Sequence, residues 1–272
     1  MIKGLFSHVI SGFLFIALLS GCSEYQRVVK SQDIDFKLEK AIEYYDQGKY
    51  NKAFPLFEEL LAQFRGSSKA EKVYFYYAET LYAMEDHILA AYHYKNFYKT
   101  FPNSQYEDKC AFMAAYCNYL ESPSFSLDQS FTYKAINEMQ LYVNTHPNSK
   151  RIPECNLLMD EMRSKLERKS YEIARQYYRM GLFQSAVTAF NNSLNDFPDS
   201  QFREDMLFLK LLSQFELAEG SIEDKKMQRY KETLTAYNEL IQFFPQTEYV
   251  KRADEIREES KRKIEQLKNQ TT

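Results

Sequence analysis

The sequence contains little glycine, no tryptophan and no excess of basic residues. Seven Gly occur among 272 residues, and Gly4, Gly12 and Gly21 fall within the first 21 positions. An all-β sandwich needs many glycine-dependent turns, so this fold class is disfavoured. Lys and Arg number 35 against 38 Asp and Glu, which gives a formal net charge of −3. Because no cationic surplus is available to neutralise phosphates, nucleic acid is disfavoured as the main partner.

Residues that build catalytic or metal sites are also scarce. The four histidines are His8, His87, His93 and His146. No His-Glu-x-x-His motif, nucleophile elbow or phosphate loop is present. An envelope hydrolase is disfavoured because neither a carboxylate pair nor a metal-ligand set can be placed. We therefore predict no enzymatic activity, no cofactor and no metal site.

The first residues have the pattern of a bacterial lipoprotein signal. Lys3 precedes an apolar run whose dense part is 9–19, shorter than the about 20 apolar residues of a membrane-spanning helix. The run ends in Leu-Ser-Gly-Cys at 19–22, which resembles the lipobox, in which the cysteine is lipidated. We predict a signal peptide over 1–21, acylation of Cys22 and a tether over 22–33. In such lipoproteins an Asp after the cysteine favours the inner membrane; Ser23 follows here, which favours the outer membrane.

A short phrase recurs along the remaining chain. It reads Phe-Pro-Asn-Ser at 101–104, His-Pro-Asn-Ser at 146–149, Phe-Pro-Asp-Ser at 197–200 and Phe-Pro-Gln-Thr at 244–247, with a degenerate Phe-Arg-Gly-Ser at 64–67. Upstream of each copy, a small residue is followed four positions later by a large one: Ala53/Phe57, Ala90/Tyr94, Ala135/Met139, Ala186/Phe190 and Thr233/Tyr237. Small residues let two helices approach, and large ones fill the space between neighbouring hairpins. The pattern resembles tetratricopeptide (TPR) repeats and predicts an all-α, TPR-type α-solenoid of about five helical hairpins.

The spacing of the copies predicts the organisation of the chain. TPR repeats 1–3 are expected over 34–152 and repeats 4–5 over 181–248. One long helix over 153–180 connects them and runs into repeat 4, because no helix breaker follows Pro153. The charged segment 249–272 is expected to be a capping helix.

Two kinds of turn signal accompany the repeats. Gly48 and Gly181 stand where a hairpin turn needs a positive φ. Ser104 with Glu107, and Ser68 with Glu71, have the spacing of a capping box at the start of the next helix.

A lipobox followed by these hairpins resembles the BamD family, lipoproteins of the outer-membrane β-barrel assembly machinery. The most specific stretches are 22–25, the tyrosine-rich 73–78 and 111–149, which includes an insertion at 122–130. The resemblance implies a scaffold at the periplasmic face of the outer membrane that binds the BamA barrel insertase and receives unfolded β-barrel proteins. The resemblance places substrate binding toward the N-terminal repeats and the BamA contact toward the C-terminal ones. No BamA-contacting residue of the family can be matched in this sequence. Other lipoproteins of the machinery are further candidate partners. The alternative is another periplasmic TPR scaffold, for glycan binding or envelope division.

The first helix of each hairpin, helix A, lines the inner surface of a TPR array. By this register the predicted peptide groove comprises Leu38, Ile42, Tyr45, Phe75, Glu79, Tyr82, Ala115, Asn118 and Tyr119. An extended strand is expected to lay its aromatic face on Tyr45, Phe75 and Tyr82, with Asn118 holding its backbone. The sequence leaves open the alternative that these rings pack between repeats.

Three cysteines remain after Cys22. Cys110 and Cys117 lie in one predicted helix with about 10 Å between their Cα atoms, too far for a disulfide. Either residue could meet Cys155, because the periplasm is oxidising. The favoured interpretation is that all three cysteines are buried and act as small apolar side chains.

Overall fold

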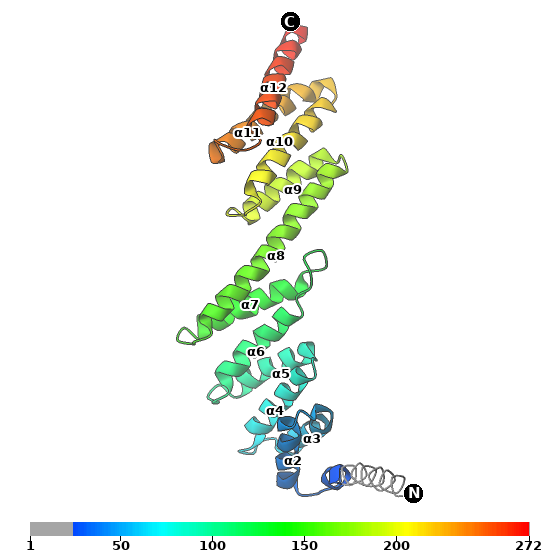
Figure 1. Cartoon of the computed structure of the whole chain (residues 1–272), viewed down its shortest axis with the longest axis vertical. Helices are drawn as coiled ribbons and strands as arrows, with labels where there is room; N and C mark the ends of the chain where they lie inside the picture. The colour runs from blue at the N-terminus through cyan, green and yellow to red at the C-terminus, as the bar shows by residue number, and fades with distance from the viewer. Residues whose placement is uncertain (1–23, 272) are drawn as a thin grey trace, which may run out of the picture. The chain divides into compact units, whose positions relative to one another are not determined.

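Figure 1 shows the computed structural model, which describes residues 24–271 as a succession of helices joined by short turns. No strand occurs among these residues. The first three hairpins pair α2 (Ile34–Asp46) with α3 (Tyr50–Gln63), α4 (Ala70–Ala83) with α5 (His87–Thr100), and α6 (Glu107–Leu120) with α7 (Ser130–Thr145). The predicted all-α fold of TPR-type helical hairpins is confirmed.

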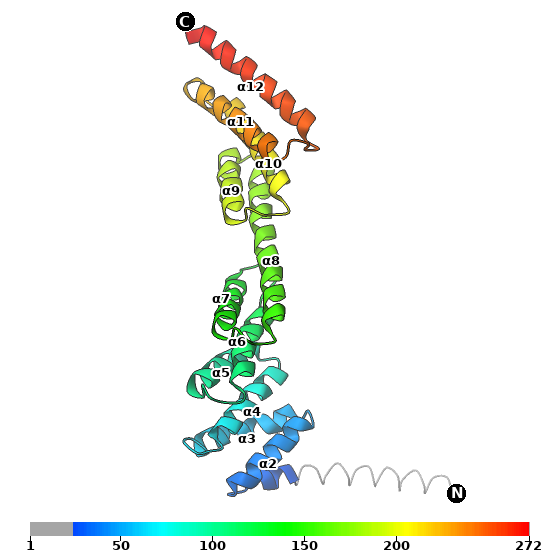
Figure 2. The same ribbon diagram turned by 90° about the vertical axis from the view of Figure 1, so that its left-hand side faces the viewer.

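The chain divides into two compact units. Unit 1 contains the described residues up to Pro123 together with Gln129–Met159, and unit 2 contains Ser124–Asp128 and the chain from Asp160 onward. The helices that follow the third hairpin are α8 (Ile152–Arg179), α9 (Phe183–Asp196), α10 (Arg203–Glu219), α11 (Glu223–Phe243) and α12 (Val250–Thr271). In unit 2, α11 and α12 run side by side (Figure 2). The uninterrupted helix expected over 153–180 is observed as α8, one residue earlier at each end.

The small and large positions of the second helix of each hairpin, helix B, are buried as the repeat pattern predicts. Ala53, Ala90, Ala135, Ala186 and Thr233 are fully buried. Phe57, Tyr94, Met139 and Phe190 are also fully buried, four residues after the corresponding small residue. Each unit therefore has its own hydrophobic core, built from the same repeated positions.

The recurring phrase forms the same hydrogen-bonded turn in every copy. The hydroxyl of its Ser or Thr accepts a bond from the backbone N–H two residues later, at 2.9–3.3 Å, in Ser67, Ser104, Ser149, Ser200 and Thr247. The expected capping boxes are wrong, because α4 and α6 begin after Lys69 and Tyr106, not after Ser68 and Ser104. The Ser104 hydroxyl instead donates to Glu71 of the preceding hairpin at 2.5 Å.

The residue that donates this N–H also joins consecutive hairpins. The Tyr106 ring stacks on Phe75 with centroids 4.0 Å apart, and Phe202 stacks on Tyr171 at 4.6 Å. Tyr249 stacks on Phe208 at 4.1 Å in the same way. In the third turn the Arg151 guanidinium takes the place of the ring and lies 4.5 Å above Phe112. A flat contact thus connects helix A of one hairpin to the start of the next.

The segment before α2 is packed against the first hairpin. Residues 24–29, which the sequence analysis assigns to the tether, are helical. Val28 is fully buried, and Tyr25 meets Tyr44 edge-on at 5.7 Å. The predicted signal peptide and Cys22 lie outside the described residues. Among the described residues, no helix has the length and apolar character needed to cross a membrane.

Three turns inside hairpins place one residue in the left-handed region. Gly48 and Gly181 have φ values of 70° and 71°, as the sequence predicts. The corresponding residue between α4 and α5 is Glu85, with φ 63°. A side chain with a Cβ costs about 1–2 kcal/mol in this conformation. Glu85 is therefore a strained position that glycine would relieve.

We predict that Glu85→Gly raises the free energy of unfolding by about 0.5–1 kcal/mol, because relief of the strain exceeds the extra chain entropy of glycine. Gly48→Ala should lower the free energy of unfolding by about 1 kcal/mol. No atom lies within 4 Å of the added Cβ at Gly48, so this cost comes from the backbone alone. Urea unfolding followed by circular dichroism measures both changes. Equal stability of Glu85→Gly and the wild type would contradict the assignment.

Candidate peptide-binding groove

The residues predicted to form the groove lie on helix A of the first three hairpins, all within unit 1. Leu38, Ile42 and Tyr45 lie on α2, Phe75, Glu79 and Tyr82 on α4, and Ala115, Asn118 and Tyr119 on α6. These nine residues differ in how far their side chains are exposed to solvent. Leu38, Phe75, Glu79, Ala115 and Asn118 are buried, whereas Ile42, Tyr45, Tyr82 and Tyr119 are partly exposed.

Glu79 is the polar centre of this region. Its carboxylate accepts hydrogen bonds from the Tyr94 hydroxyl at 2.7 Å and from the Tyr45 hydroxyl at 3.3 Å. Lys109 Nζ donates to it at 2.6 Å. These donors come from α5, α2 and α6, so one buried carboxylate connects helices of all three hairpins. Burial and the adjacent carboxylate raise the pKa of Tyr94 and of Tyr45 well above the usual tyrosine value, so both remain neutral donors.

Two predicted contact residues have structural partners of their own. Phe75 is the ring on which Tyr106 stacks, and its relative exposure is 8%. The Asn118 side-chain amide donates to the backbone carbonyl of Ala114 at 2.7 Å, within its own helix. Neither side chain is therefore placed to contact a peptide directly. Leu38, Glu79 and Ala115 are buried as well. The predicted groove residues that remain accessible to a peptide are Ile42, Tyr45, Tyr82 and Tyr119.

Further partly exposed rings stand beside these tyrosines. Tyr76 meets Tyr45 edge-on at 5.3 Å, and Tyr116 stacks on Tyr119 at 5.7 Å. Tyr76 and Tyr116 are not among the groove residues expected from the sequence. The signal that could have found them is the density of tyrosine in 73–78 and 116–119, because side chains three or four residues apart on a helix, such as Tyr116 and Tyr119, are neighbours on its surface. The helix A side of unit 1 therefore carries a group of aromatic rings.

A recess of 670 Å³ lies at the first hairpin. Leu38 and Ile42 line it, together with the charged residues Asp33, Asp35, Glu39, Lys69 and Lys72. Lys69 forms an ion pair with Asp35 at 2.6 Å, between helices of neighbouring hairpins. The recess thus combines an apolar floor with charges of both signs.

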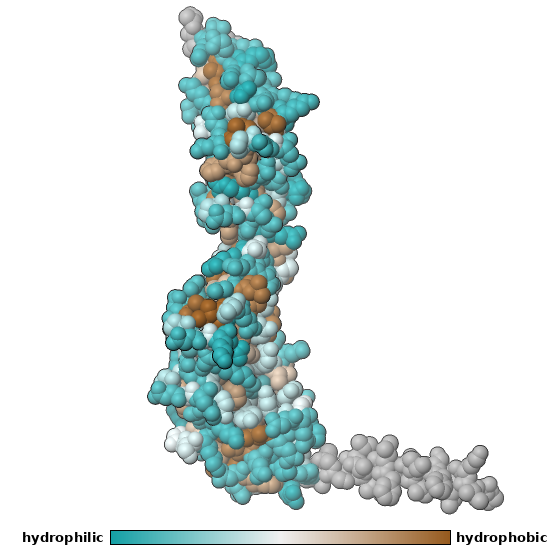
Figure 3. All heavy atoms as spheres, turned by 60° about the vertical axis from the view of Figure 1, so that its left-hand side comes forward, coloured by the Kyte–Doolittle hydropathy of each residue, from teal (hydrophilic) through white to brown (hydrophobic). Residues whose placement is uncertain are grey.

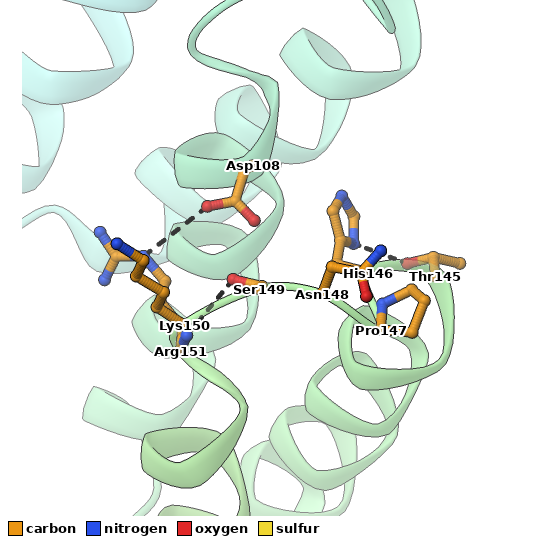
Figure 4. Close-up of a pocket in the computed structure, with 8 residues that line it drawn as sticks. All are labelled: Asp108, Thr145, His146, Pro147, Asn148, Ser149, Lys150 and Arg151. Atoms are coloured by element: carbon orange, nitrogen blue, oxygen red, sulfur yellow. Dashed lines mark hydrogen bonds and ion pairs between the residues drawn. The ribbon is translucent and has the colours of Figure 1, made fainter.

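A second recess, of 660 Å³, lies at the turn after α7, and most of the residues that line it are polar or charged (Figure 4). Arg151 reaches toward Asp108 at 4.0 Å. The His146 ring stacks on Tyr142 at 4.6 Å, and its Nε2 lies 3.0 Å from Glu107. Each of these side chains joins the turn to α6 or α7, which is a structural role. Among the described residues, no group of three His, Cys, Asp or Glu side chains could hold a metal ion.

The cysteines of unit 1 are free and buried. Cys110, Cys117 and Cys155 form no disulfide, in agreement with the favoured interpretation of the sequence. Burial raises the pKa of the Cys117 thiol to about 12 and that of the Cys155 thiol to about 11. Burial raises the pKa of Cys110 as well. The reactive thiolate is therefore suppressed at all three positions.

We predict that iodoacetamide at pH 8 leaves Cys110, Cys117 and Cys155 unmodified in the folded protein and alkylates all three in urea. Mass spectrometry of the corresponding peptides measures this. Rapid alkylation of any of the three in the folded state would contradict the burial described above.

We predict that Glu79→Gln lowers the free energy of unfolding by about 2–3 kcal/mol, because Lys109 and the hydroxyls of Tyr45 and Tyr94 lose their charged acceptor. The matched control is Glu58→Gln, which changes an exposed carboxylate on α3 and should alter stability by less than about 0.5 kcal/mol. Thermal unfolding of both variants makes the comparison. An equal effect of the two substitutions would show that Glu79 does not join the hairpins.

Comparison with protein families identifies the chain. The model of the YfiO family, described as an outer membrane lipoprotein, matches residues 35–218. This range contains every groove residue named above and ends within α10. No curated protein sequence matches the chain significantly. Because the family match spans more than half of the chain, the protein belongs to the YfiO family of outer membrane lipoproteins.

Proposed function

We propose that the protein is a BamD-like scaffold, lipid-anchored at the periplasmic face of the outer membrane. In this proposal it binds a BamA-like barrel insertase and receives unfolded β-barrel proteins for folding and insertion. Membership of an outer membrane lipoprotein family supports the location. The lipobox that ends at Cys22 supports an acyl anchor. The proposal includes no catalytic step, cofactor or metal.

The observation that carries the proposal is the group of partly exposed tyrosines on helix A of three successive hairpins. Tyr45, Tyr82 and Tyr119 present ring surface, while Glu79 and the Phe75–Tyr106 stack hold the helices beneath them. A strand of a barrel protein alternates apolar and polar side chains. Its apolar face can therefore lie across these rings in an extended conformation.

The groove chemistry favours broad recognition. Ring surfaces accept many apolar side chains, whereas a buried, directional polar group would select one sequence. Asn118 is occupied by its own helix, and Glu79 by three donors. The groove therefore suits a receptor for many barrel proteins that share a pattern rather than a sequence.

We predict that replacing both Tyr45 and Tyr82 by Ala weakens binding of a barrel-protein strand peptide about 10- to 30-fold, because two ring contacts of about 1 kcal/mol each are lost. Fluorescence anisotropy with a labelled C-terminal strand peptide measures the dissociation constant. A peptide of the same composition with the alternation scrambled should bind the wild type more weakly.

Two paired controls keep this test specific. Tyr45→Phe with Tyr82→Phe retains the rings and should retain most of the affinity. Tyr92→Ala with Tyr133→Ala removes two tyrosines that are 60% and 57% exposed on helix B of their hairpins, and should leave the affinity unchanged. Unchanged affinity of the folded Tyr45→Ala/Tyr82→Ala variant would remove the groove from the proposal. Binding of glycan chains instead of the peptide would favour a glycan scaffold.

A further inference from the structure

A recess in unit 2 differs in chemistry from the groove. The loop 124–128 packs along α8 and, with that helix, encloses 490 Å³. Phe125 forms one wall, and Ile173 lines the recess from α8. Lys169, Arg175 and Arg179 also line it, and Glu172 is the one acidic residue among the lining side chains.

The cations around this recess are poorly neutralised. Among the described residues, Arg168, Lys169 and Arg179 have no carboxylate within ion-pair distance. Lys169 donates to the backbone carbonyl of Leu127, and the Arg168 guanidinium lies 4.2 Å above the Phe125 ring. Only Arg175 has an acidic partner, Glu172 at 3.5 Å. The whole chain has a net charge of −3, so this group of cations is a local feature.

Exposed apolar side chains continue along the same helix. Ile173, Tyr177 and Met180 are 43%, 37% and 59% exposed. Ile173 and Tyr177 lie four residues apart and therefore on one side of α8, and Met180 directly follows the last residue of the helix. Figure 3 shows that hydrophobic residues form separate patches on a mostly hydrophilic surface. An apolar stripe beside unpaired cations is the composition of a surface that a partner covers.

We propose that this surface of α8 and the loop 124–128 docks an acidic, apolar segment of a partner protein. Carboxylates of the partner pair with Lys169 and Arg179, and one apolar side chain enters the recess against Phe125 and Ile173. Charge complementarity selects the partner: among the described residues Arg168, Lys169 and Arg179 form no ion pair, so they attract carboxylates and repel basic segments. The inference does not rest on the tyrosine groove of unit 1, with which this surface shares no residue.

A protein segment fits this surface better than a lipid bilayer does. The recess is concave and walled by a ring, which suits one inserted side chain. An anionic bilayer presents many headgroups to a broad basic face, whereas Glu172 interrupts the cations here. The partner is therefore identified by closely spaced acidic and apolar side chains.

The test uses the full-length mature protein held in nanodiscs of zwitterionic lipid and short fluorescent peptides. One peptide combines Glu with Phe and Leu, a second replaces Glu by Lys, and a third replaces the apolar residues by Ser. We expect only the acidic, apolar peptide to bind the wild type. Lys169→Gln with Arg179→Gln should weaken this binding about tenfold at low salt, and Ile173→Ser should weaken it without changing its salt dependence.

The matched control removes two exposed cations elsewhere in unit 2, with Lys225→Gln and Lys251→Gln, and should leave the affinity unchanged. Equal weakening by the two charge pairs would overturn the proposal, because the effect would be one of net charge. Equal binding of the Lys peptide, or no binding of the acidic, apolar peptide at millimolar concentration, would also overturn it. Vesicles of phosphatidylglycerol that bind through Lys169 and Arg179, while the peptides do not, would assign the surface to the membrane instead.

Discussion

The flat contact between consecutive hairpins is the interaction on which the rest of the structure depends. In each copy of the recurring phrase, a Ser or Thr hydroxyl fixes the backbone two residues ahead. In four of the five copies that residue places a ring, as in the Phe75–Tyr106 and Tyr171–Phe202 pairs, or a guanidinium over helix A of the preceding hairpin. In the first copy the residue is Lys69, which forms an ion pair with Asp35 of α2 instead. Because a repeat cannot bury its apolar face alone, the orientation of each hairpin depends on this contact. The orientation of the hairpins in turn determines which side chains of helix A remain partly exposed.

The repeated positions of the fold could be predicted from the sequence because their causes are local. A small residue followed four positions later by a large one, as in Ala90 and Tyr94, predicts that two helices approach closely and that the large side chain fills the space between neighbouring hairpins. Gly48 and Gly181 similarly predict a turn residue with a positive φ, and the structure shows one at both positions. Glu85 occupies the same conformation without a glycine, so no sequence signal marks it. The predicted capping boxes are wrong because the Ser104 hydroxyl accepts a hydrogen bond from the backbone N–H two residues later, at Tyr106. Glu71 accepts a hydrogen bond from Ser104, at the start of the next hairpin.

The candidate site could be predicted only to the level of a helix face. Helix A of the first three hairpins does carry partly exposed rings, but burial of Phe75 and Glu79 depends on partners 30 or more residues away in sequence. The buried Glu79 carboxylate accepts hydrogen bonds from three donors and joins the hairpins, so it is not available to bind a ligand. The α8 surface shows the opposite case. Its cations look ordinary in a charge-balanced sequence, and only the fold shows that Arg168, Lys169 and Arg179 form no ion pair among the described residues.

The central claim is that the tyrosines of helix A contact an extended polypeptide while those of helix B do not. Fluorine NMR of the protein containing 3-fluorotyrosine, titrated with a barrel-protein strand peptide, tests this claim most directly because each ring reports its own environment. The account predicts that the resonances of Tyr45, Tyr82 and Tyr119 shift on saturation and that those of the helix B residues Tyr92 and Tyr133 do not. Shifts at Tyr92 and Tyr133, with the helix A tyrosines unchanged, would contradict it.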